Sequence, residues 1–371
     1  MILLVGGGGI PNYGDELIIN NWLKWYHDSG LIDNQSMIVE GYRSSVLRNM
    51  FADRFPRARW SHTIREARVK HRSLDFWGAL ARGLNVANST DDAGQHSFRE
   101  ASEASLMHIH GGGYINGKWP SHAFVLGLAS AAREKSDTRA ITTGIGISPL
   151  AEPDTDQRKI LDRAIESFDF VEVRDVWSYE YLRRNLSGDR PNKIVLGLDD
   201  AFLYRVESTG QDHRTLHLAL RDDPQADSII ERLTNKFVGS FDRHLFWVCK
   251  HTDAGAYVKV ANRFRLFELA GTTQLVEDPR LGPNDTLITE RFHPHLQAAR
   301  SGASGVYWSG SEYYDTKHGS LVDLGSPFVA DDGKEFGGLK PAKSPSKMRV
   351  DDPENIATKQ GLARRALKLL E

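Results

Sequence analysis

The sequence predicts an α/β fold with two domains, each built on a parallel sheet. Three observations support this prediction. The 371 residues exceed the usual size of one domain, which is about 100–200 residues. Short apolar runs alternate with helix-forming stretches, as buried parallel strands alternate with crossover helices. This alternation stops near residue 208 and then starts again, which indicates domains at 1–207 and 208–371.

The expected strands of the first domain are apolar runs, several of which end in glycine. They are 2–9 ("ILLVGGGG"), 105–113 ("SLMHIHGGG"), 140–148 ("AITTGIGIS"), 170–175 ("FVEVRD") and 194–199 ("IVLGLD"). We expect helices to begin near Asp15 and Ala123. Ligands of such sheets bind at the carboxyl ends of the strands, which is where the glycine loops lie.

The second domain repeats this pattern. Its expected strands are 216–223, 244–253, 273–278, 286–291 and 304–310, and its expected helices are 227–241 and 294–302. The tail from residue 351 predicts one more helix, which could pack back on the first domain.

Composition excludes several classes of protein. Lys and Arg number 47 against 49 acidic residues, a net charge of −2, so no basic excess indicates nucleic-acid binding. Cys249 is the single cysteine, which excludes an intramolecular disulfide or a cysteine-rich zinc site and suits a reducing compartment. No apolar run approaches the ~20 residues of a spanning helix, and the run 2–5 is too short for a signal peptide. We expect a cytoplasmic protein, at most peripherally bound at the inner face of the membrane.

Residues 43–82 depart from this balance. They contain ten Lys or Arg residues against three acidic ones, an excess of +7, with five aromatic residues interleaved. One interpretation is a solvated, irregular insertion over about 43–100. The other is a basic, aromatic face that contacts an anionic polymer or the phosphates of a membrane surface.

The glycine loops do not match the common nucleotide-binding patterns. A dinucleotide loop, G-x-G-x-x-G, needs a third glycine for close helix–strand packing, but counting from Gly6 that position is Pro11. The stretch 112–119 ("GGYINGKW") follows a P-loop until Trp119, which replaces the magnesium-binding Ser or Thr. Neither NAD nor an ordinary P-loop nucleotide is indicated.

Two acids, Asp15 and Glu16, end the first glycine loop where a helix is expected to begin. Asp15 could cap this helix through backbone N–H groups, worth ~1 kcal/mol, while Glu16 complements the helix dipole. An acid at this position also disfavours phosphate and favours hydrogen bonds from hydroxyls. The alternative interpretation is therefore a sugar contact.

The segment 289–302 ("TERFHPHLQAARSG") carries the most reactive side chains. Arg291 and His293 follow an expected strand, and strand alternation would direct both toward a cleft. Arginine offers a planar fork for phosphate or carboxylate, and histidine transfers protons near neutral pH. A metal site of His293 and His295 is disfavoured, because their spacing around Pro294 matches no common zinc pattern.

Taken together, six segments resemble the polysaccharide pyruvyl transferase family. They are "GGGGIPNYGDELI" (6–18), "HGGGYINGKWPSH" (110–122), "VEVRDVWSYEYLR" (171–183), "GLDDAFL" (197–203), "TERFHPHLQAA" (289–299) and "YYDTKHGSLVDLG" (313–325). The resemblance covers roughly residues 1–327, with 43–100 unmatched.

The resemblance implies a glycosyltransferase-B-like fold, in which two Rossmann-like domains face each other across a cleft. It also implies transfer of pyruvate from phosphoenolpyruvate to a sugar of a cell-surface polysaccharide or lipid-linked precursor, as a ketal, without a cofactor or required metal. The acceptor would bind on the first domain and the donor on the second. Asn12 and Asp15 would then face the acceptor hydroxyls, and Asp15 could act as a base.

By matching positions, the resemblance implies that His293 is the general acid and Arg291 a phosphoenolpyruvate ligand. Arg174 and His122 are expected in the donor site, and Lys317 is expected to bind there as well. Two other functions stay open. One is a nucleotide-sugar glycosyltransferase, with Arg291 and Lys317 on the diphosphate; the other is a non-catalytic glycan-binding module.

Overall fold

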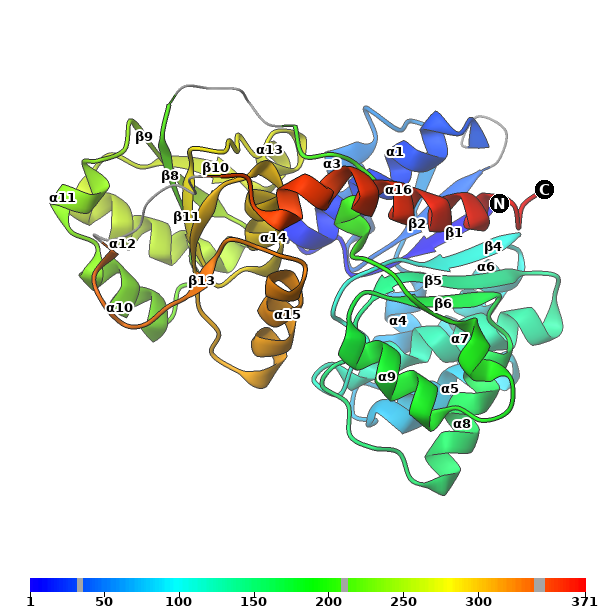
Figure 1. The fold of residues 1–371 in the computed structure, drawn as a ribbon. Helices are drawn as coiled ribbons and strands as arrows, with labels where there is room; N and C mark the ends of the chain where they lie inside the picture. The colour runs from blue at the N-terminus through cyan, green and yellow to red at the C-terminus, as the bar shows by residue number, and fades with distance from the viewer. Residues whose placement is uncertain (32–35, 208–212, 337–343) are drawn as a thin grey trace. The chain divides into compact units, whose positions relative to one another are not determined.

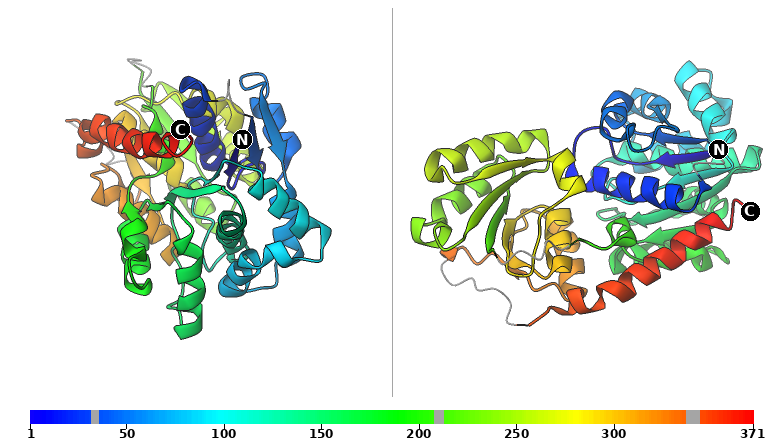
Figure 2. Two further views of the ribbon diagram at one scale, coloured as in Figure 1. Left: turned by 90° about the vertical axis from the view of Figure 1, so that its right-hand side faces the viewer. Right: turned by 90° about the horizontal axis from the view of Figure 1, so that it is seen from above.

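The structure is a computed structural model that describes residues 1–31, 36–207, 213–336 and 344–371. The chain forms two compact units (Figures 1 and 2). The first unit comprises Met1–Ile10, Ile18–Leu203 and Ala357–Glu371, and the second comprises Pro11–Leu17 and Tyr204–Ile356. These units differ from the domains expected at 1–207 and 208–371: the boundary lies after Leu203, residues 11–17 belong to the second unit, and residues 357–371 belong to the first.

The first unit contains a seven-stranded parallel sheet in the order β3-β2-β1-β4-β5-β6-β7. Its strands are β1 (Ile2–Val5), β2 (Met37–Glu40), β3 (Ala58–Ser61), β4 (Leu106–Ile109), β5 (Arg139–Ile145), β6 (Phe170–Val173) and β7 (Ile194–Leu196). The central strands consist almost entirely of buried side chains, because helices cover both faces of the sheet.

Helices α1 (Tyr13–Asp28) and α16 (Lys347–Leu367) lie on one face of this sheet (Figures 1 and 2). Helices α5 (Phe76–Leu84), α7 (Ala123–Lys135) and α8 (Thr155–Glu166) lie on the other. The remaining helices of this unit are α3 (Ser44–Phe51), α4 (Thr63–Lys70), α6 (Asp92–Ser102) and α9 (Val176–Asn185).

The basic segment 43–82 is regular, so the expectation of an irregular insertion is wrong. It supplies α3, β3, α4 and most of α5. Phe51, Phe55, Phe76 and Trp77 are buried, so these four cannot form part of an aromatic face on the surface. The apolar positions of the helices recur at helical spacing and face inward, whereas most of the arginines of this segment are exposed, several of them in the turns between the elements.

The second unit contains a six-stranded parallel sheet in the order β10-β9-β8-β11-β12-β13. Its strands are β8 (Thr215–Ala219), β9 (Arg243–Val248), β10 (Glu268–Gly271), β11 (Thr286–Thr289), β12 (Ser304–Tyr307) and β13 (Val329–Ala330). Its helices are α10 (Pro224–Arg232), α11 (Asn235–Val238), α12 (Ala254–Phe264), α13 (Thr272–Glu277), α14 (Phe292–Ser301) and α15 (Glu312–Asp323).

Two sequence-based assignments in this unit are wrong. The strand expected at 273–278 is helix α13, because the true strand β10 ends just before it and the buried pair Leu275 and Val276 packs from a helix. The single helix expected at 227–241 is two helices. Thr234 starts the second, α11, by accepting a hydrogen bond from the Phe237 N–H at 3.1 Å.

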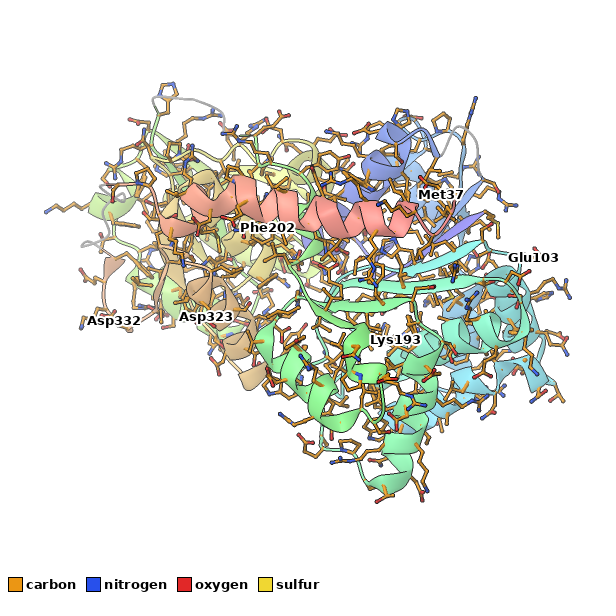
Figure 3. The ribbon with its side chains drawn as sticks, turned by 45° about the vertical axis from the view of Figure 1, so that its right-hand side comes forward. Met37, Glu103, Lys193, Phe202, Asp323 and Asp332 are labelled. Carbon is orange, nitrogen blue, oxygen red and sulfur yellow. The ribbon has the colours of Figure 1, made fainter. Side chains whose placement is uncertain are left out.

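The C-terminal part of α16 is anchored in the first unit by a buried lysine. Lys359 is fully buried, and its Nζ lies 2.8 Å from both carboxylate oxygens of Glu172 and also pairs with Asp200. Phe202, labelled in Figure 3, belongs to the helical turn Asp200–Leu203, whose last carbonyl accepts a hydrogen bond from Gln360. The expected return of the tail helix to the first domain is therefore present. Within the described ranges, no helix combines the length and the apolar character needed to cross a membrane.

Candidate active site

The loop that follows the first glycines docks on the second unit. The Tyr13 N–H donates a hydrogen bond to the carbonyl of Cys249 at 2.8 Å, and Asn12 forms an antiparallel bridge with Lys250. The Tyr13 ring packs edge-on against Trp247 of β9, with 5.3 Å between ring centroids. This loop therefore lies at the carboxyl end of β9, beside the loops that follow the other strands of that sheet.

His293 lies directly against this loop. Gly14 leaves room for it: a Cβ atom on Gly14 would lie 1.8 Å from Nδ1 of His293. The structure thus brings together two segments that are about 280 positions apart in the sequence. The expected strand geometry is wrong, however, because β11 ends at Thr289. Arg291 is instead the N-terminal cap residue of α14, and His293 lies in the first turn of that helix.

Arg291 is fixed by a buried acid that the sequence analysis did not identify. Its Nη2 forms an ion pair with Oδ1 of Asp253, which is fully buried. The other carboxylate oxygen of Asp253 accepts a hydrogen bond from the Lys250 N–H at 3.0 Å. Burial raises the pKa of Asp253, while the charge of Arg291 opposes that rise. Among the described residues, no hydrogen-bond acceptor reaches the buried Nε of Arg291.

Glu290 and Arg221 form further contacts at the turn between β11 and α14, residues 290 and 291. Glu290 is buried and lies immediately before Arg291. Its Oε1 accepts a hydrogen bond from the Arg221 N–H at 2.8 Å, and its Oε2 lies 2.7 Å from the Arg221 guanidinium. The β8 and β11 loops are therefore joined at their carboxyl ends.

Lys317 lies near the turn on helix α15. Its Nζ hydrogen-bonds to the hydroxyl of Tyr313 and lies 5.8 Å from the ring centroid of Phe292. Phe292 separates Arg291 from His293, so the structure places the cationic Lys317 side chain beside the same segment.

Asn12 and Asp15 are bonded to each other. The side-chain amide of Asn12 donates to Oδ2 of Asp15 at 2.7 Å. The interpretation of Asp15 as the cap of α1 is wrong, because the helix begins at Tyr13 and Asp15 lies in its first turn. The carbonyl of Asn12 accepts the first helical bond, from Glu16.

Arg174 and His122 both belong to the first unit, whereas His293 belongs to the second. Arg174 follows β6, is buried, and pairs with the buried Asp199 at 2.6 Å. Gly146 permits this position, because a Cβ there would lie 3.2 Å from Nε of Arg174.

His122 lies in a network that includes two residues absent from the sequence-based site. Its Nδ1 donates to the Trp119 carbonyl at 3.1 Å, and its Nε2 accepts from Arg68 at 2.7 Å and from the hydroxyl of Tyr42. Burial, with the neighbouring charge of Arg68, lowers the pKa of His122 to about 3. His122 is therefore neutral near pH 7 and acts there through hydrogen bonds.

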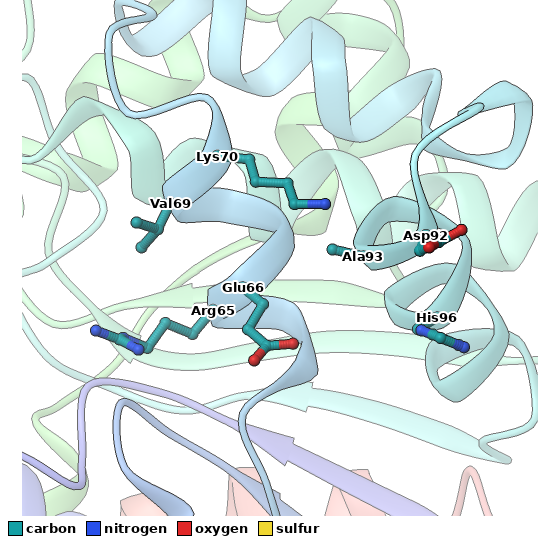
Figure 4. Close-up of a pocket in the computed structure, with 7 residues that line it drawn as sticks. All are labelled: Arg65, Glu66, Val69, Lys70, Asp92, Ala93 and His96. Atoms are coloured by element: carbon teal, nitrogen blue, oxygen red, sulfur yellow. The ribbon is translucent and has the colours of Figure 1, made fainter.

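A separate pocket of about 510 Å³ lies between α4 and α6 in the first unit (Figure 4). In Figure 4, Lys70 reaches from α4 toward Ala93 on α6. The seven lining residues are Arg65, Glu66, Val69, Lys70, Asp92, Ala93 and His96. Its cations are accompanied by two carboxylates, so this part of the basic segment does not concentrate positive charge.

The sequence analysis named Arg291 and His293 as candidates because they lie close together after an expected strand. It missed Asp253, Glu290 and Arg221, which are ordinary surface-type residues in the sequence and are recognisable only once the strand ends meet. Within the parts of the chain that the structure describes, no group of three or more His, Cys, Asp or Glu side chains is arranged as metal ligands would be.

A family model identifies the family of the chain, and solved structures identify its fold. A family model described as polysaccharide pyruvyl transferase matches residues 12–267. This match includes Asn12, Asp15, His122 and Arg174 but ends before Arg291. No curated protein sequence gives a significant match.

Solved structures of two epimerases share the fold. UDP-GlcNAc 2-epimerase from Methanocaldococcus jannaschii aligns with a TM-score of 0.55 at 10% identity, covering 99% of this chain and 100% of that chain. UDP-N-acetylglucosamine 2-epimerase from Rickettsia bellii aligns with a TM-score of 0.53 at 9% identity, covering 99% and 96%. At such low identity the likeness shows the fold alone, and it confirms the α/β class with two Rossmann-like parts.

Proposed function

The chain belongs to the polysaccharide pyruvyl transferase family, an enzyme family, and from this premise we propose that it transfers pyruvate from phosphoenolpyruvate to a sugar. The acceptor class would be a cell-surface polysaccharide or its lipid-linked precursor. The product would be a cyclic ketal that bridges two hydroxyls of one sugar.

The proposed reaction needs one proton donor and several fixed cations. A proton added to the methylene carbon of phosphoenolpyruvate makes C2 electrophilic, and one sugar hydroxyl attacks it. The C2–O bond to phosphate then breaks, a second hydroxyl closes the ketal, and inorganic phosphate leaves. The two hydroxyl protons balance the one added to carbon and the one carried away by phosphate or base. Arginine suits the donor because it binds carboxylate and phosphate through paired N–H groups.

The observation that carries this proposal is the contact of His293 with Gly14, two residues along α14 from Arg291. The buried Nε of Arg291 has no acceptor among the described residues, and Asp253 holds the rest of its guanidinium in place. A phosphate or carboxylate oxygen of the donor would supply the missing acceptor. In this proposal His293 is the general acid and Lys317 adds positive charge beside it.

Asn12 and Asp15 are proposed to meet the acceptor. They lie one and two residues from the glycine that His293 contacts, so a hydroxyl bound there would be near the proposed acid. Asp15 already accepts a hydrogen bond from Asn12, which leaves its other oxygen to act as a base. For Arg174 and His122 we keep the proposal of a donor-binding role. Since His122 is neutral near pH 7, it would act there as a hydrogen-bonding group.

A thermal-shift titration tests the donor. A ligand that binds only the folded protein raises its melting temperature with concentration. We expect phosphoenolpyruvate to stabilise the protein, and UDP-GlcNAc and GDP-mannose to leave it unchanged. Stabilisation by a nucleotide sugar and not by phosphoenolpyruvate would replace this proposal with a glycosyltransferase.

Substitution of His293 tests the chemistry. In an assay of phosphate release from phosphoenolpyruvate with an acceptor glycan, His293→Ala should lower kcat by ~100-fold or more, as expected for a general acid. His213→Ala is the matched control, since His213 is exposed and belongs to the same unit. Equal rates for the two variants would remove His293 from the mechanism.

A further inference from the structure

Two buried histidines lie behind the turn that carries Arg291 and His293, and the proposed reaction does not use them. His295 is on α14 and His318 is on α15, and both are fully buried. Their Nδ1 atoms lie 2.9 Å apart. The two rings stack, with 5.2 Å between centroids and 21° between planes. Tyr307 also stacks on His295, at 5.1 Å and 20°.

The hydrogen bonds of this pair define one tautomer for each ring. Nε2 of His318 lies 3.1 Å from the carbonyl oxygen of Glu290, which can only accept, so the proton of His318 is on Nε2. Its Nδ1 is then an acceptor, and Nδ1 of His295 must donate to it. Nε2 of His295 in turn accepts from the hydroxyl of Ser326 at 2.7 Å. The chain of donors therefore runs in one direction, from Ser326 through both rings to Glu290.

Burial favours the neutral form of both imidazole rings, which this series of hydrogen bonds requires. It lowers the pKa of His318 to about 4, with Lys317 acting in the same direction and Asp315 and the Glu290 carbonyl against it. It also lowers the pKa of His295 well below its ordinary value, and the neighbouring His318 adds to this effect. A proton added to Nε2 of His295 would reverse its hydrogen bond with Ser326, whose hydroxyl would then have to accept instead of donate. With both ring nitrogens of His295 occupied, neither can bind a metal.

This series of hydrogen bonds ends at the carbonyl of Glu290, the residue before Arg291. The carbonyl of Glu290 is held by His318, its carboxylate by Arg221, and the following N–H, that of Arg291, by Oγ1 of Thr289 at 2.8 Å. The peptide unit between Glu290 and Arg291 is thus held on both sides. Its orientation determines the direction in which Arg291 leaves the strand and in which α14, with His293 in its first turn, begins.

We propose that His295 and His318 are positioning residues that set the turn from Glu290 to His293 through a one-directional hydrogen-bond chain. The catalytic part of this inference rests on the proposed function; the tautomers of the two rings do not. In this role each histidine is required as a donor at one nitrogen and an acceptor at the other, which gives a structural reason for two buried, hydrogen-bonded imidazoles at this place.

The first test is nitrogen-15 NMR of the intact protein labelled at histidine. We expect His295 as the neutral Nδ1–H tautomer and His318 as the neutral Nε2–H tautomer, with neither titrating between pH 5.5 and 8. Signals are assigned by their loss in His295→Phe and in His318→Gln. The opposite tautomer at either ring, or a titration midpoint near 6.5, would overturn the inference. This result is independent of any activity, so it stands or falls apart from the proposed reaction.

The second test is rescue by a side chain that keeps the required donor. The amide nitrogen of glutamine can occupy the place of Nε2, whereas leucine cannot donate. We expect His318→Leu to lower kcat for phosphate release by about tenfold or more. We expect His318→Gln to recover most of that loss, with equal circular-dichroism spectra for the two folded variants. An unchanged rate for His318→Leu, or no recovery for His318→Gln, would contradict a positioning role.

Discussion

Gly14 is the residue of the N-terminal loop against which His293 packs. Any side chain there would overlap the imidazole of His293, since a Cβ would lie 1.8 Å from Nδ1. We therefore expect Gly14→Ala to displace His293 and to lower kcat by about 100-fold, because a shift of about 1 Å at a catalytic group costs that much. The assay is phosphate release from phosphoenolpyruvate, with melting temperature measured alongside.

The matched control is Gly271→Ala. This glycine lies in the same unit, and a Cβ there would meet no atom within 4 Å. Its activity should equal that of the wild type. If Gly14→Ala retained full activity, His293 would not act from the position described here.

Glu40, at the end of β2, predicts a pH dependence of stability. It is buried, and this burial raises its pKa from 4.5 to about 8, against the hydrogen bond from the Arg65 N–H. The folded state therefore holds the proton more tightly than the unfolded state. Its contribution to stability is complete below pH 4.5 and is lost as the pH rises toward 8, by up to about 1.4 kcal/mol for each pH unit.

The substitution Glu40→Gln should remove this loss, because glutamine stays neutral and can still accept from Arg65. In urea unfolding, we expect the variant to match the wild type at pH 5 and to exceed its free energy of unfolding at pH 8. Glu66→Gln, at an exposed position on α4 next to Arg65, should show no such divergence. Parallel pH curves for Glu40→Gln and the wild type would show that Glu40 ionises normally.

At the scale of elements, the last helix depends on one ion pair network. Lys359 of α16 is the cation for two fully buried carboxylates, Glu172 and Asp200. Removing one partner of a buried pair leaves an uncompensated charge, which costs about 3–5 kcal/mol. Lys359→Met should therefore lower the free energy of unfolding by about that amount, measured with urea. Lys368→Met, at an exposed position one residue beyond the helix, should have little effect.

A second variant separates charge from packing. In the double variant, Lys359→Met removes the buried cation and Glu172→Gln neutralises one of the two carboxylates that this cation would otherwise have paired with. It should be more stable than Lys359→Met alone, because only Asp200 remains unpaired. If the double variant were the less stable of the two, the lysine would act mainly through packing.

The elements also show what a sequence can predict. Strands such as β1 and β11 were found because both faces are buried and their apolar runs are continuous. Helix α13 was mistaken for a strand because six residues are too few to distinguish the two periods. The segment 43–82 was misinterpreted because net charge hid its helical spacing of buried residues.

The same limit applies to the site. Arg291 and His293 were predicted since they are adjacent and chemically distinctive. Asp253 and His318 were not, because their importance depends on contacts with residues 38 and 28 positions away. Only the assembled sheet brings such partners together.

At the scale of the whole molecule, the chain path joins the two units in an unusual way. The chain crosses between them four times, after residues 10, 17, 203 and 356. Residues 11–17 complete the second unit, where Tyr13 packs on Trp247. Residues 357–371 complete the first, where Lys359 pairs with Glu172. Helix α1 begins in the second unit and continues into the first. Helix α16 likewise begins in the second unit and ends in the first.

This exchange predicts that the protein remains assembled after its central connection is cut. A protease site inserted within residues 208–212 would divide the chain into two pieces, each of which keeps a segment belonging to the other piece's unit. We expect the pieces to elute together in size-exclusion chromatography and to separate only in denaturant. The same cut in a protein with Lys359→Met and Tyr13→Ala should release them, because both exchanged segments lose their main contacts. Separation of the unsubstituted pieces after cutting would mean that the exchanged segments bind too weakly to complete the units.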